Sequence, residues 1–201
     1  MTPLKRLTDI FFALILAVFL LPVILVISLA ILIIDGRPIF YISDRARAPD
    51  KAFRLMKFRT MRADNYDFGA SGGHKASRIT KTGGYLRKTR LDEVPQLWNI
   101  LKGDMSFVGP RPPLQMYVEQ FPEIYCEVLK SRPGVTGLAS VYFHRHEEFL
   151  LDQCTTPEEN EHIYKTRCIP RKAYLDLLYA RNRNFCADVW LMLATVFKGL
   201  R

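Results

Sequence analysis

The 201-residue sequence predicts a mostly helical α/β protein that is held at a membrane by its N-terminal segment. Residues 10–34 carry no charge, whereas residues 39–43 and 53–60 show the alternation of short strands. Several segments after residue 85 place apolar side chains at helical spacing. We therefore divide the chain into a membrane helix, residues 1–36, and one small domain, residues 37–201.

The composition is strongly basic. Twenty-nine lysines and arginines against 20 acidic residues give a net charge of +9 and a pI near 9.5. This excess fits an anionic partner: nucleic acid, an anionic membrane surface or phosphorylated substrates. The sequence shows no nucleic-acid-binding module, so we expect no nucleic acid as a partner. The four cysteines lack CxxC spacing, and we expect reduced thiols facing the cytosol.

The apolar segment, residues 10–34, is long enough to cross a bilayer. A straight helix of this length would reach about 37 Å, more than the ~30 Å of the hydrocarbon core. A signal peptide is disfavoured, because the apolar run is too long and no small-residue cleavage site follows it. The simplest interpretation is a single-pass anchor.

A re-entrant helix is the alternative. Pro22 lies near the middle of the segment, where a proline removes a hydrogen bond and kinks a helix. Basic residues also flank both ends, with Lys5 and Arg6 before the segment and several arginines from Arg37 onward. A kinked helix that enters and leaves one leaflet would keep both groups on the same face. The residues alone leave both interpretations open.

The small domain begins with the two predicted strands. Residues 64–77 are rich in glycine and polar residues and predict a loop, because they lack the phosphate-binding G-x-x-x-x-G-K-[ST] pattern. After Gly83 and Gly84, residues 85–90 predict a helix. A second, amphipathic helix should begin near Asp92, because Pro95 is tolerated only in a first turn.

Asp92 and Glu93 have two possible roles. Taken alone, Asp92 would be a helix N-cap and Glu93 a first-turn acid. The surroundings favour chemistry on a phosphate, because arginines suited to bidentate phosphate binding lie close to glycine and proline turns. These arginines are Arg87, Arg90, Arg111 and Arg132.

Three motifs carry a resemblance to a known family. They are LDEVPQLWNILKGDMSFVGPRPP at residues 91–113, RPGVTGLA at residues 132–139 and FRLMKFRTM at residues 53–61. With the apolar N-terminus, the chain resembles the bacterial sugar transferases, and more narrowly the small monotopic (PglC-like) phosphoglycosyl transferases. This resemblance implies a kinked re-entrant helix broken at Pro22, here within Leu21-Pro22 in place of the usual Ser-Pro. It also implies residence in the bacterial inner (cytoplasmic) membrane, with the catalytic domain, residues 37–201, on the cytoplasmic face.

The resemblance further implies an activity. Family members transfer a sugar-1-phosphate from a UDP-sugar to polyprenyl (undecaprenyl) phosphate, release UMP and start the assembly of membrane glycoconjugates. Asp92 matches the nucleophile of a ping-pong mechanism with a covalent aspartyl phospho-sugar intermediate, and Glu93 matches its acidic partner. Mg²⁺ is the implied cofactor, held by Asp92 and Glu93. Arg87, Arg111 and Arg132 match phosphate-binding positions.

The match weakens after Ala139. Many relatives read GLAQVNGR, whereas this chain continues with SVYFHRHEE, so Arg145 aligns with the final arginine only after a one-residue shift. Arg145 is therefore a further candidate for substrate binding. The run HRHEE, residues 144–148, has no HExxH spacing, and we expect surface pairing or substrate contact there instead of a metal.

The C-terminal part predicts two further helices, at residues 169–182 and 185–200. The second is apolar but too short to span, and it suits either an interfacial helix or core packing. An anionic phospholipid membrane and downstream glycosyltransferases are thus expected partners. Two rival functions remain: a membrane-anchored Mg²⁺-dependent phosphatase or pyrophosphatase, and a non-catalytic scaffold for glycosyltransferases.

Overall fold

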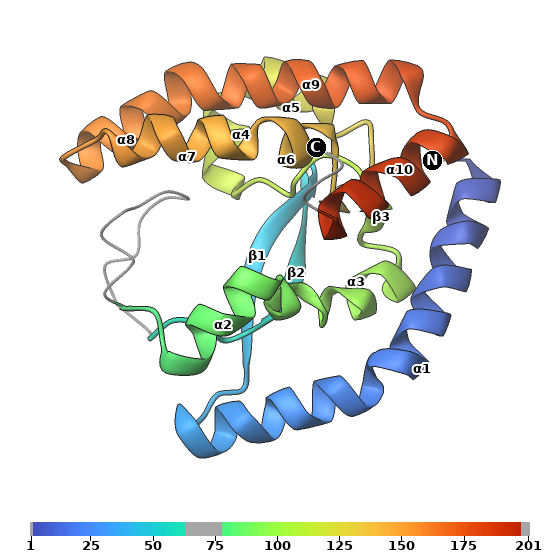
Figure 1. Cartoon of the computed structure of the whole chain (residues 1–201). Coiled ribbons are helices and arrows are strands. Elements are labelled where there is room, and N and C mark those ends of the chain that lie inside the picture. The colour runs from blue at the N-terminus through green and yellow to red at the C-terminus, as the bar shows by residue number, and fades with distance from the viewer. Residues whose placement is uncertain (1, 63–77, 198–201) are drawn as a thin grey trace.

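The computed structural model describes residues 2–62 and 78–197 and has the predicted mostly helical α/β architecture (Figure 1). The long helix α1, Pro3–Ile34, is followed by the antiparallel hairpin of β1, Phe40–Ala48, and β2, Lys51–Phe58. Helix α2, Lys81–Thr89, the short 3₁₀ turn η2, Leu91–Glu93, and helix α3, Gln96–Lys102, come next. The predicted loop at residues 64–77 lies outside the described residues.

The second half of the chain is helical around one small parallel sheet. Strands β3, Ser106–Val108, and β4, Gly134–Thr136, form this sheet, with Ser106 opposite Gly134. The helices are α4, Gln115–Gln120; α5, Pro122–Val128; α6, Leu138–Tyr142; α7, His144–Asp152; α8, Pro157–Ile163; the π-helical turn η3, Tyr164–Cys168; α9, Ile169–Asn182; and α10, Phe185–Val196.

Several boundaries differ from those predicted. Helix α2 begins at Lys81, because the Thr80 side chain accepts a hydrogen bond from the backbone of Gly83 and caps the first turn. The helix predicted near Asp92 begins only at Gln96. Arg90 has a left-handed conformation with φ 60°, which ends α2, and a 3₁₀ turn separates it from α3. Pro95 is accordingly the N-cap residue of α3.

Helix α1 is long and apolar enough to cross a membrane, alone among the helices in the described part of the chain. One face is exposed and apolar: Val18 and Phe19 are 72% and 73% exposed. The other face is buried, with Ala13 and Ile31 fully covered. Figure 1 shows the helix running down one side of the molecule and then turning across its base. One face of the helix is thus part of the protein surface, and the other face is part of the core.

Both halves of α1 pack against the same domain. Ala13, in the first half, belongs to a cluster with Phe53 of β2 and Ile100 of α3. Ile31, in the second half, packs with Phe58 of β2 and Leu86 of α2. The hairpin therefore contacts α1 on both sides of Pro22.

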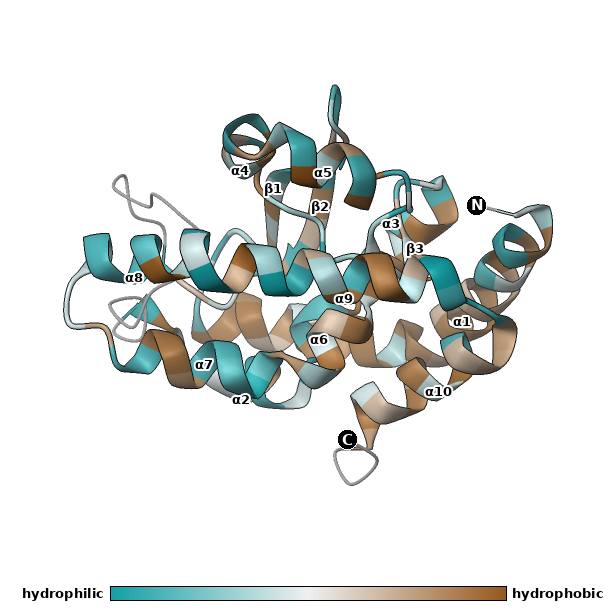
Figure 2. Cartoon of the chain, turned by 90° about the horizontal axis from the view of Figure 1, so that it is seen from above, coloured by the Kyte–Doolittle hydropathy of each residue, from teal (hydrophilic) through white to brown (hydrophobic). Residues whose placement is uncertain are grey.

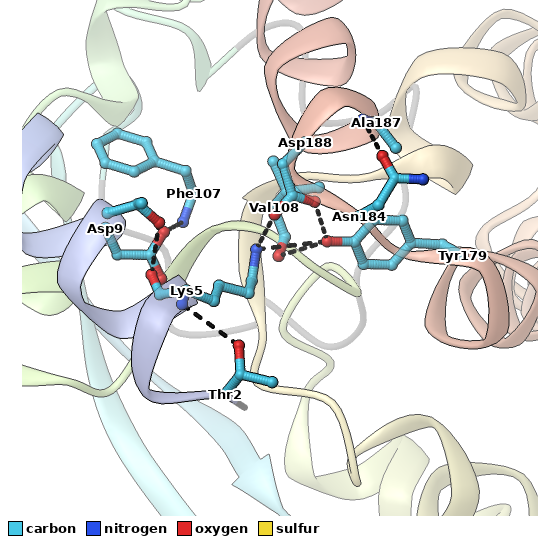
Figure 3. A network of polar contacts seen from close by, with 10 residues as sticks. Thr2, Lys5, Asp9, Phe107, Val108, Tyr179, Asn184, Ala187 and Asp188 are labelled. Carbon is cyan, nitrogen blue, oxygen red and sulfur yellow. Dashed lines mark hydrogen bonds and ion pairs between the residues drawn. The ribbon is translucent and has the colours of Figure 1, made fainter.

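Polar contacts also fasten both ends of α1. At its start, Lys5 forms a half-buried ion pair of 2.5 Å with Asp188 of α10, and Tyr179 of α9 donates a hydrogen bond to the same carboxylate (Figure 3). At its end, Arg59 donates hydrogen bonds of 2.8 and 2.7 Å to the carbonyls of Asp35 and Gly36. Both ends are therefore held against the domain.

The helices of the second half of the chain lie across the end of the hairpin that carries its turn, where Ala46 of β1 packs against them (Figure 1). Helices α4 to α9 supply the core of this region, including the buried side chains of Tyr117, Tyr164 and Ile169. Helix α10 packs Leu191 and Ala194 against Val108 of β3 and exposes Trp190 and Val196, and Phe197 after its end is also exposed. The core-packing alternative predicted for this helix is confirmed, and the exposed apolar side chains leave the interfacial alternative a prediction. Figure 2 shows the apolar character of α1 and α10 against the more polar α7 and α8.

Candidate active site

The 3₁₀ turn η2 sets the orientation of the acidic pair. It follows the left-handed Arg90, and its three residues direct neighbouring side chains differently. Glu93 points into the protein and is 9% exposed, whereas Asp92 is half-buried. The two carboxylates therefore have different environments, although they are adjacent in the chain.

Glu93 is surrounded by cations. Lys57 Nζ lies 2.8 Å from Oε1, Arg111 Nη2 lies 3.4 Å from Oε1, and Arg90 Nη1 lies 3.6 Å from Oε2. Burial alone would raise the pKa of Glu93, but the charges of Arg111, Lys57 and Arg90 and the hydrogen bond from Lys57 lower it to about 2. Glu93 is therefore an anchor for positive charge that stays ionised over the physiological range.

Lys57 was not among the site residues predicted from the sequence. It lies on β2, and burial followed by the charge of Arg111 lowers its pKa, while Glu93 acts in the opposite direction. The strand pattern contained a signal for it. Phe53 and Leu55 are buried, and Lys57 follows them on the same face of the strand. A lysine on the inner face of a strand requires a buried partner, here Glu93.

Asp92 remains open on the outer side of the turn. Within the described residues, its carboxylate makes no hydrogen bond or ion pair with another side chain. Burial and then the charge of Glu93 raise the pKa of Asp92, while Lys57, Arg87 and Arg111 act to lower it. An open carboxylate beside arginine and lysine, but not paired with either, is available to a substrate or a metal ion.

Arg111 and Arg87 lie near the pair, as predicted. Arg111 contacts Glu93 directly, and the charge of Glu93 is the main cause that raises the pKa of Arg111. Arg87, on α2, acts on Asp92 electrostatically and contacts the sulfur of Met61 at 3.3 Å. A small cavity of about 30 Å³ opens beside Glu93. Its lining is mostly polar or basic and comes from Arg45, Leu55, Lys57, Glu93, Gln96, Arg111, Pro112, Gly134 and Val135.

The other two predicted arginines lie elsewhere. Arg132 is beside Arg6 and Gly103, at the end of α3, and does not line the cavity. Arg145 is exposed on α7. Its neighbour His144 is closer to the site, because Arg90 and Arg111 contribute to the lowering of its pKa, after burial and against the charge of Glu148. His144 also approaches Glu148 at 3.4 Å, and Glu147 forms an ion pair of 2.9 Å with Lys172 of α9, so the HRHEE run takes part in charge pairing.

The acidic pair offers one free carboxylate for a cation. No cluster of three His, Cys, Asp or Glu side chains able to hold a metal occurs in residues 2–62 and 78–197. Both oxygens of Glu93 already face Lys57, Arg111 or Arg90. Mg²⁺ is commonly held by one or two carboxylates together with substrate phosphates, so Asp92 alone fits that requirement when a diphosphate is bound.

Fold and site together define a membrane-associated protein whose acidic pair is set among basic side chains suited to phosphates. The chain belongs to the bacterial sugar transferase family, whose model matches residues 1–201.

Three relatives illustrate the similarity. The chain is 33% identical over 199 residues to a UDP-glucose:undecaprenyl-phosphate glucose-1-phosphate transferase of Klebsiella pneumoniae, covering 97% of this chain and 40% of the relative. It is 43% identical over 119 residues to a putative undecaprenyl-phosphate N-acetylgalactosaminyl 1-phosphate transferase of Bacillus subtilis (strain 168), covering 59% of this chain and 66% of the relative.

The third relative is closer in length. It is the uncharacterized sugar transferase EpsL of Bacillus subtilis (strain 168), 34% identical over 201 residues, with 98% of this chain and 87% of the relative covered. The chain thus spans about two fifths of the Klebsiella protein but most of the EpsL protein.

Proposed function

We propose that this protein transfers a sugar-1-phosphate from a UDP-sugar to polyprenyl phosphate and releases UMP. The observation that carries the proposal is the difference between the side-chain contacts of Asp92 and those of Glu93. Glu93 is ion-paired to Lys57 and Arg111. Asp92 beside it is open, and Lys57, Arg87 and Arg111 lie near enough to act on its charge. Such an arrangement suits a nucleophile that must approach a negatively charged diphosphate.

In the first half-reaction, a carboxylate oxygen of Asp92 attacks the β-phosphorus of the UDP-sugar. A new oxygen–phosphorus bond forms, and the bond between the β-phosphorus and the bridging oxygen of UMP breaks. UMP leaves with the electron pair, and an aspartyl phospho-sugar remains. Arg111 and Arg87 offset the charge on the phosphoryl oxygens, because guanidinium groups bind them bidentately.

In the second half-reaction, an oxygen of polyprenyl phosphate attacks the same phosphorus. The bond to Asp92 breaks, which restores the carboxylate and yields the polyprenyl diphosphate sugar. Glu93 takes no part in bond formation; it keeps Lys57 and Arg111 in place throughout. His144 lies on α7 at the edge of the site, where it can contact the donor beyond its phosphates, and Arg145 follows it on the exposed side of that helix.

Mg²⁺ is the proposed cofactor, and Asp92 is the residue that would hold it together with diphosphate oxygens. When bound, it supplies charge neutralisation on the leaving phosphate. Glu93 supports this site indirectly through its cation pairs.

We further propose that α1 is re-entrant, with the catalytic domain on the cytoplasmic face. A helix that crosses the bilayer leaves its two ends on opposite faces, about 30 Å apart. Here Lys5 and Arg59 fasten the two ends to one domain, and both halves pack against the hairpin. A bend at Pro22 would allow this geometry within one leaflet.

The test is to incubate the full chain in membranes with Mg²⁺ and radiolabelled UDP-sugars, one at a time, without acceptor. We expect label on the protein and one equivalent of UMP, with polyprenyl phosphate then discharging the label to lipid. Asp92→Asn should lose both labelling and UMP release by roughly a thousandfold or more. Arg171→Gln, on the exposed side of α9, is the matched control and should retain both.

Three outcomes would contradict the proposal. Wild-type turnover by Asp92→Asn would remove Asp92 as the nucleophile. Release of inorganic phosphate without any lipid acceptor would indicate a phosphatase or pyrophosphatase. Failure of every UDP-sugar to release UMP, with a folded protein in the membrane, would indicate a scaffold.

A further inference from the structure

Three arginines from different parts of the chain gather at the start of α1. Arg6 belongs to α1, Arg47 to β1, and Arg132 lies between α5 and β4. The guanidinium groups of Arg6 and Arg132 both approach Gly103. Arg6 Nη2 and Arg132 Nη1 lie 3.3 and 3.9 Å from the point where a side chain at Gly103 would begin. The absence of a side chain at this residue leaves room for both groups.

The cluster carries more positive than negative charge. Burial, then the charges of Arg47 and Arg6, lower the pKa of Arg132, and the carboxylates of Asp9 and Asp104 oppose this effect. Asp104 is 3.8 Å from Lys102, and Asp9 accepts a hydrogen bond of 3.4 Å from the backbone of Phe107. Three arginines therefore meet two carboxylates, and one oxygen of each carboxylate, Asp9 Oδ2 and Asp104 Oδ2, is buried without a hydrogen-bond partner among the described residues.

The three arginines differ in whether their guanidinium groups form hydrogen bonds within the protein. Arg6 donates hydrogen bonds of 2.6 and 2.8 Å to the carbonyls of Ile100 and Leu101, which satisfies the C-terminal end of α3. Arg47 and Arg132 are half-buried, and neither forms a hydrogen bond or ion pair with another residue in the described parts of the chain. Two guanidinium groups beside a third can bind an oxyanion from outside.

The position of the cluster indicates where that oxyanion comes from. Arg6 is flanked on α1 by Leu4 and Leu7, which are 69% and 65% exposed and belong to the apolar face of the helix. The end of an apolar helix that lies in one leaflet is at headgroup depth, where lipid phosphates are concentrated. The cluster does not line the cavity beside Glu93.

We propose that Arg47 and Arg132, supported by Arg6, bind the phosphate of an anionic glycerophospholipid headgroup. This inference rests on the proposed placement of α1 in one leaflet, and it does not depend on the proposed chemistry at Asp92. It assigns Arg132 to a phosphate of the membrane, not to a phosphate of the sugar nucleotide. A headgroup held here fixes the end of the domain nearest the start of α1 against the bilayer.

The experiment uses the full chain in neutral detergent micelles. Thermal unfolding is followed while dihexanoyl phosphatidylglycerol, dihexanoyl phosphatidylcholine or inorganic phosphate is titrated. For wild type, we expect phosphatidylglycerol to raise the melting temperature more than the other two additives, because binding to the native state stabilises it. Arg47→Gln/Arg132→Gln should lose this difference. Lys130→Gln/Arg171→Gln removes the same charge from exposed positions and should keep it.

A phosphatidylglycerol effect that persists in Arg47→Gln/Arg132→Gln would overturn the inference. An equal effect of inorganic phosphate would also overturn it, because the site would then recognise a free anion. UMP release separates the two proposals. A raised KM for the UDP-sugar in the variant, with the lipid effect retained, would place Arg132 at the donor. A lipid effect in a protein that releases no UMP would support this inference and contradict the proposed function.

Discussion

Lys57 and Glu93 form a buried ion pair of 2.8 Å that joins β2 to the turn carrying Asp92. The pair holds Asp92 in place without contacting it, since the carboxylate of Glu93 also binds Arg111 and Arg90. The position of the proposed nucleophile therefore depends on its neighbour in the chain and on a strand about 35 residues earlier.

Replacement of Lys57 should lower the free energy of unfolding. Lys57→Met leaves the buried Glu93 carboxylate with two weaker contacts, and breaking a buried pair typically costs about 3–5 kcal/mol. Urea unfolding should show this loss. Lys130→Met is the control, because its pair with Glu127 is exposed and should contribute less than about 1 kcal/mol. Similar losses in the two variants would argue against a strong Lys57–Glu93 pair.

UMP release should decline in acid through protonation of Asp92. Burial and the charge of Glu93 raise the pKa of Asp92 above its ordinary value of 3.8, so the acidic midpoint of kcat/KM should lie above that value. Arg87→Gln removes a charge that lowers this pKa and should move the midpoint to higher pH. The midpoint is measured from pH 4 to 8. If it is unchanged in Arg87→Gln, the charge of Arg87 does not lower the pKa of Asp92.

Stability should fall with rising pH because of Asp176. This residue of α9 is 7% exposed, and burial raises its pKa to about 7, against the charge of Lys172 and a hydrogen bond from the backbone of Ala139. The folded state binds the proton more tightly than the unfolded state, so the stabilisation is complete below about pH 4 and is lost through pH 7.

Asp176→Asn should remove this dependence. One pKa unit corresponds to about 1.4 kcal/mol, so the difference between wild type and variant should change by up to about 4 kcal/mol between pH 4 and pH 8. The measurement is urea unfolding at several pH values. Parallel curves for the two proteins would show that Asp176 does not titrate in this range.

Gly83 and Gly84 should respond oppositely to alanine. A Cβ on Gly83 would lie 2.2 Å from the carbonyl oxygen of Thr60, whereas one on Gly84 would find only Ile79 at 4.0 Å. Gly83→Ala should destabilise by about 1–3 kcal/mol through overpacking. Gly84→Ala should stabilise by roughly 0.5–1 kcal/mol, because alanine favours a helix. Thermal unfolding of both variants checks the pair, and equal effects would contradict the close approach of α2 to Thr60.

Secondary structure could be predicted from the sequence in segments whose apolar residues follow a single spacing, that of a strand or that of a helix. Strands near residues 40 and 55 and the helix at 169–182 follow directly from alternation and helical spacing. The strands β3 and β4 were not predicted, because each has three residues and pairs with a partner almost 30 residues away. Such pairing depends on tertiary contacts that a local pattern does not contain.

The kinds of residues that form the candidate site could be predicted from the sequence better than the position of each residue in space. Asp92, Glu93 and Arg111 were grouped by their motif, and the structure brings them together. Lys57 was missed because its partner is distant in sequence, although the inward face of the strand pointed to it. Arg132 is near a turn and looked similar to Arg111, but its position in space depends on α1 and α3.

Lys5 and Arg6 show a second limit of sequence reasoning. Their position beside the apolar segment predicts surface charges that report the orientation of the helix. In the structure, Lys5 is paired with Asp188, and Arg6 binds the end of α3. Basic residues that are used to predict membrane orientation can thus form contacts within the fold. The sequence alone does not distinguish these two roles.

With α1 in one leaflet, as proposed, the two faces of this helix would make lipid a structural component of the protein. Ala13 and Ile31 complete the cores under β2, while Val18 and Phe19 on the same helix face outward. We therefore expect insertion of the helix to be coupled to closure of the domain. A truncated chain that starts after Ile34 would expose Phe53, Phe58 and Leu86, so we expect it to aggregate instead of remaining a soluble enzyme.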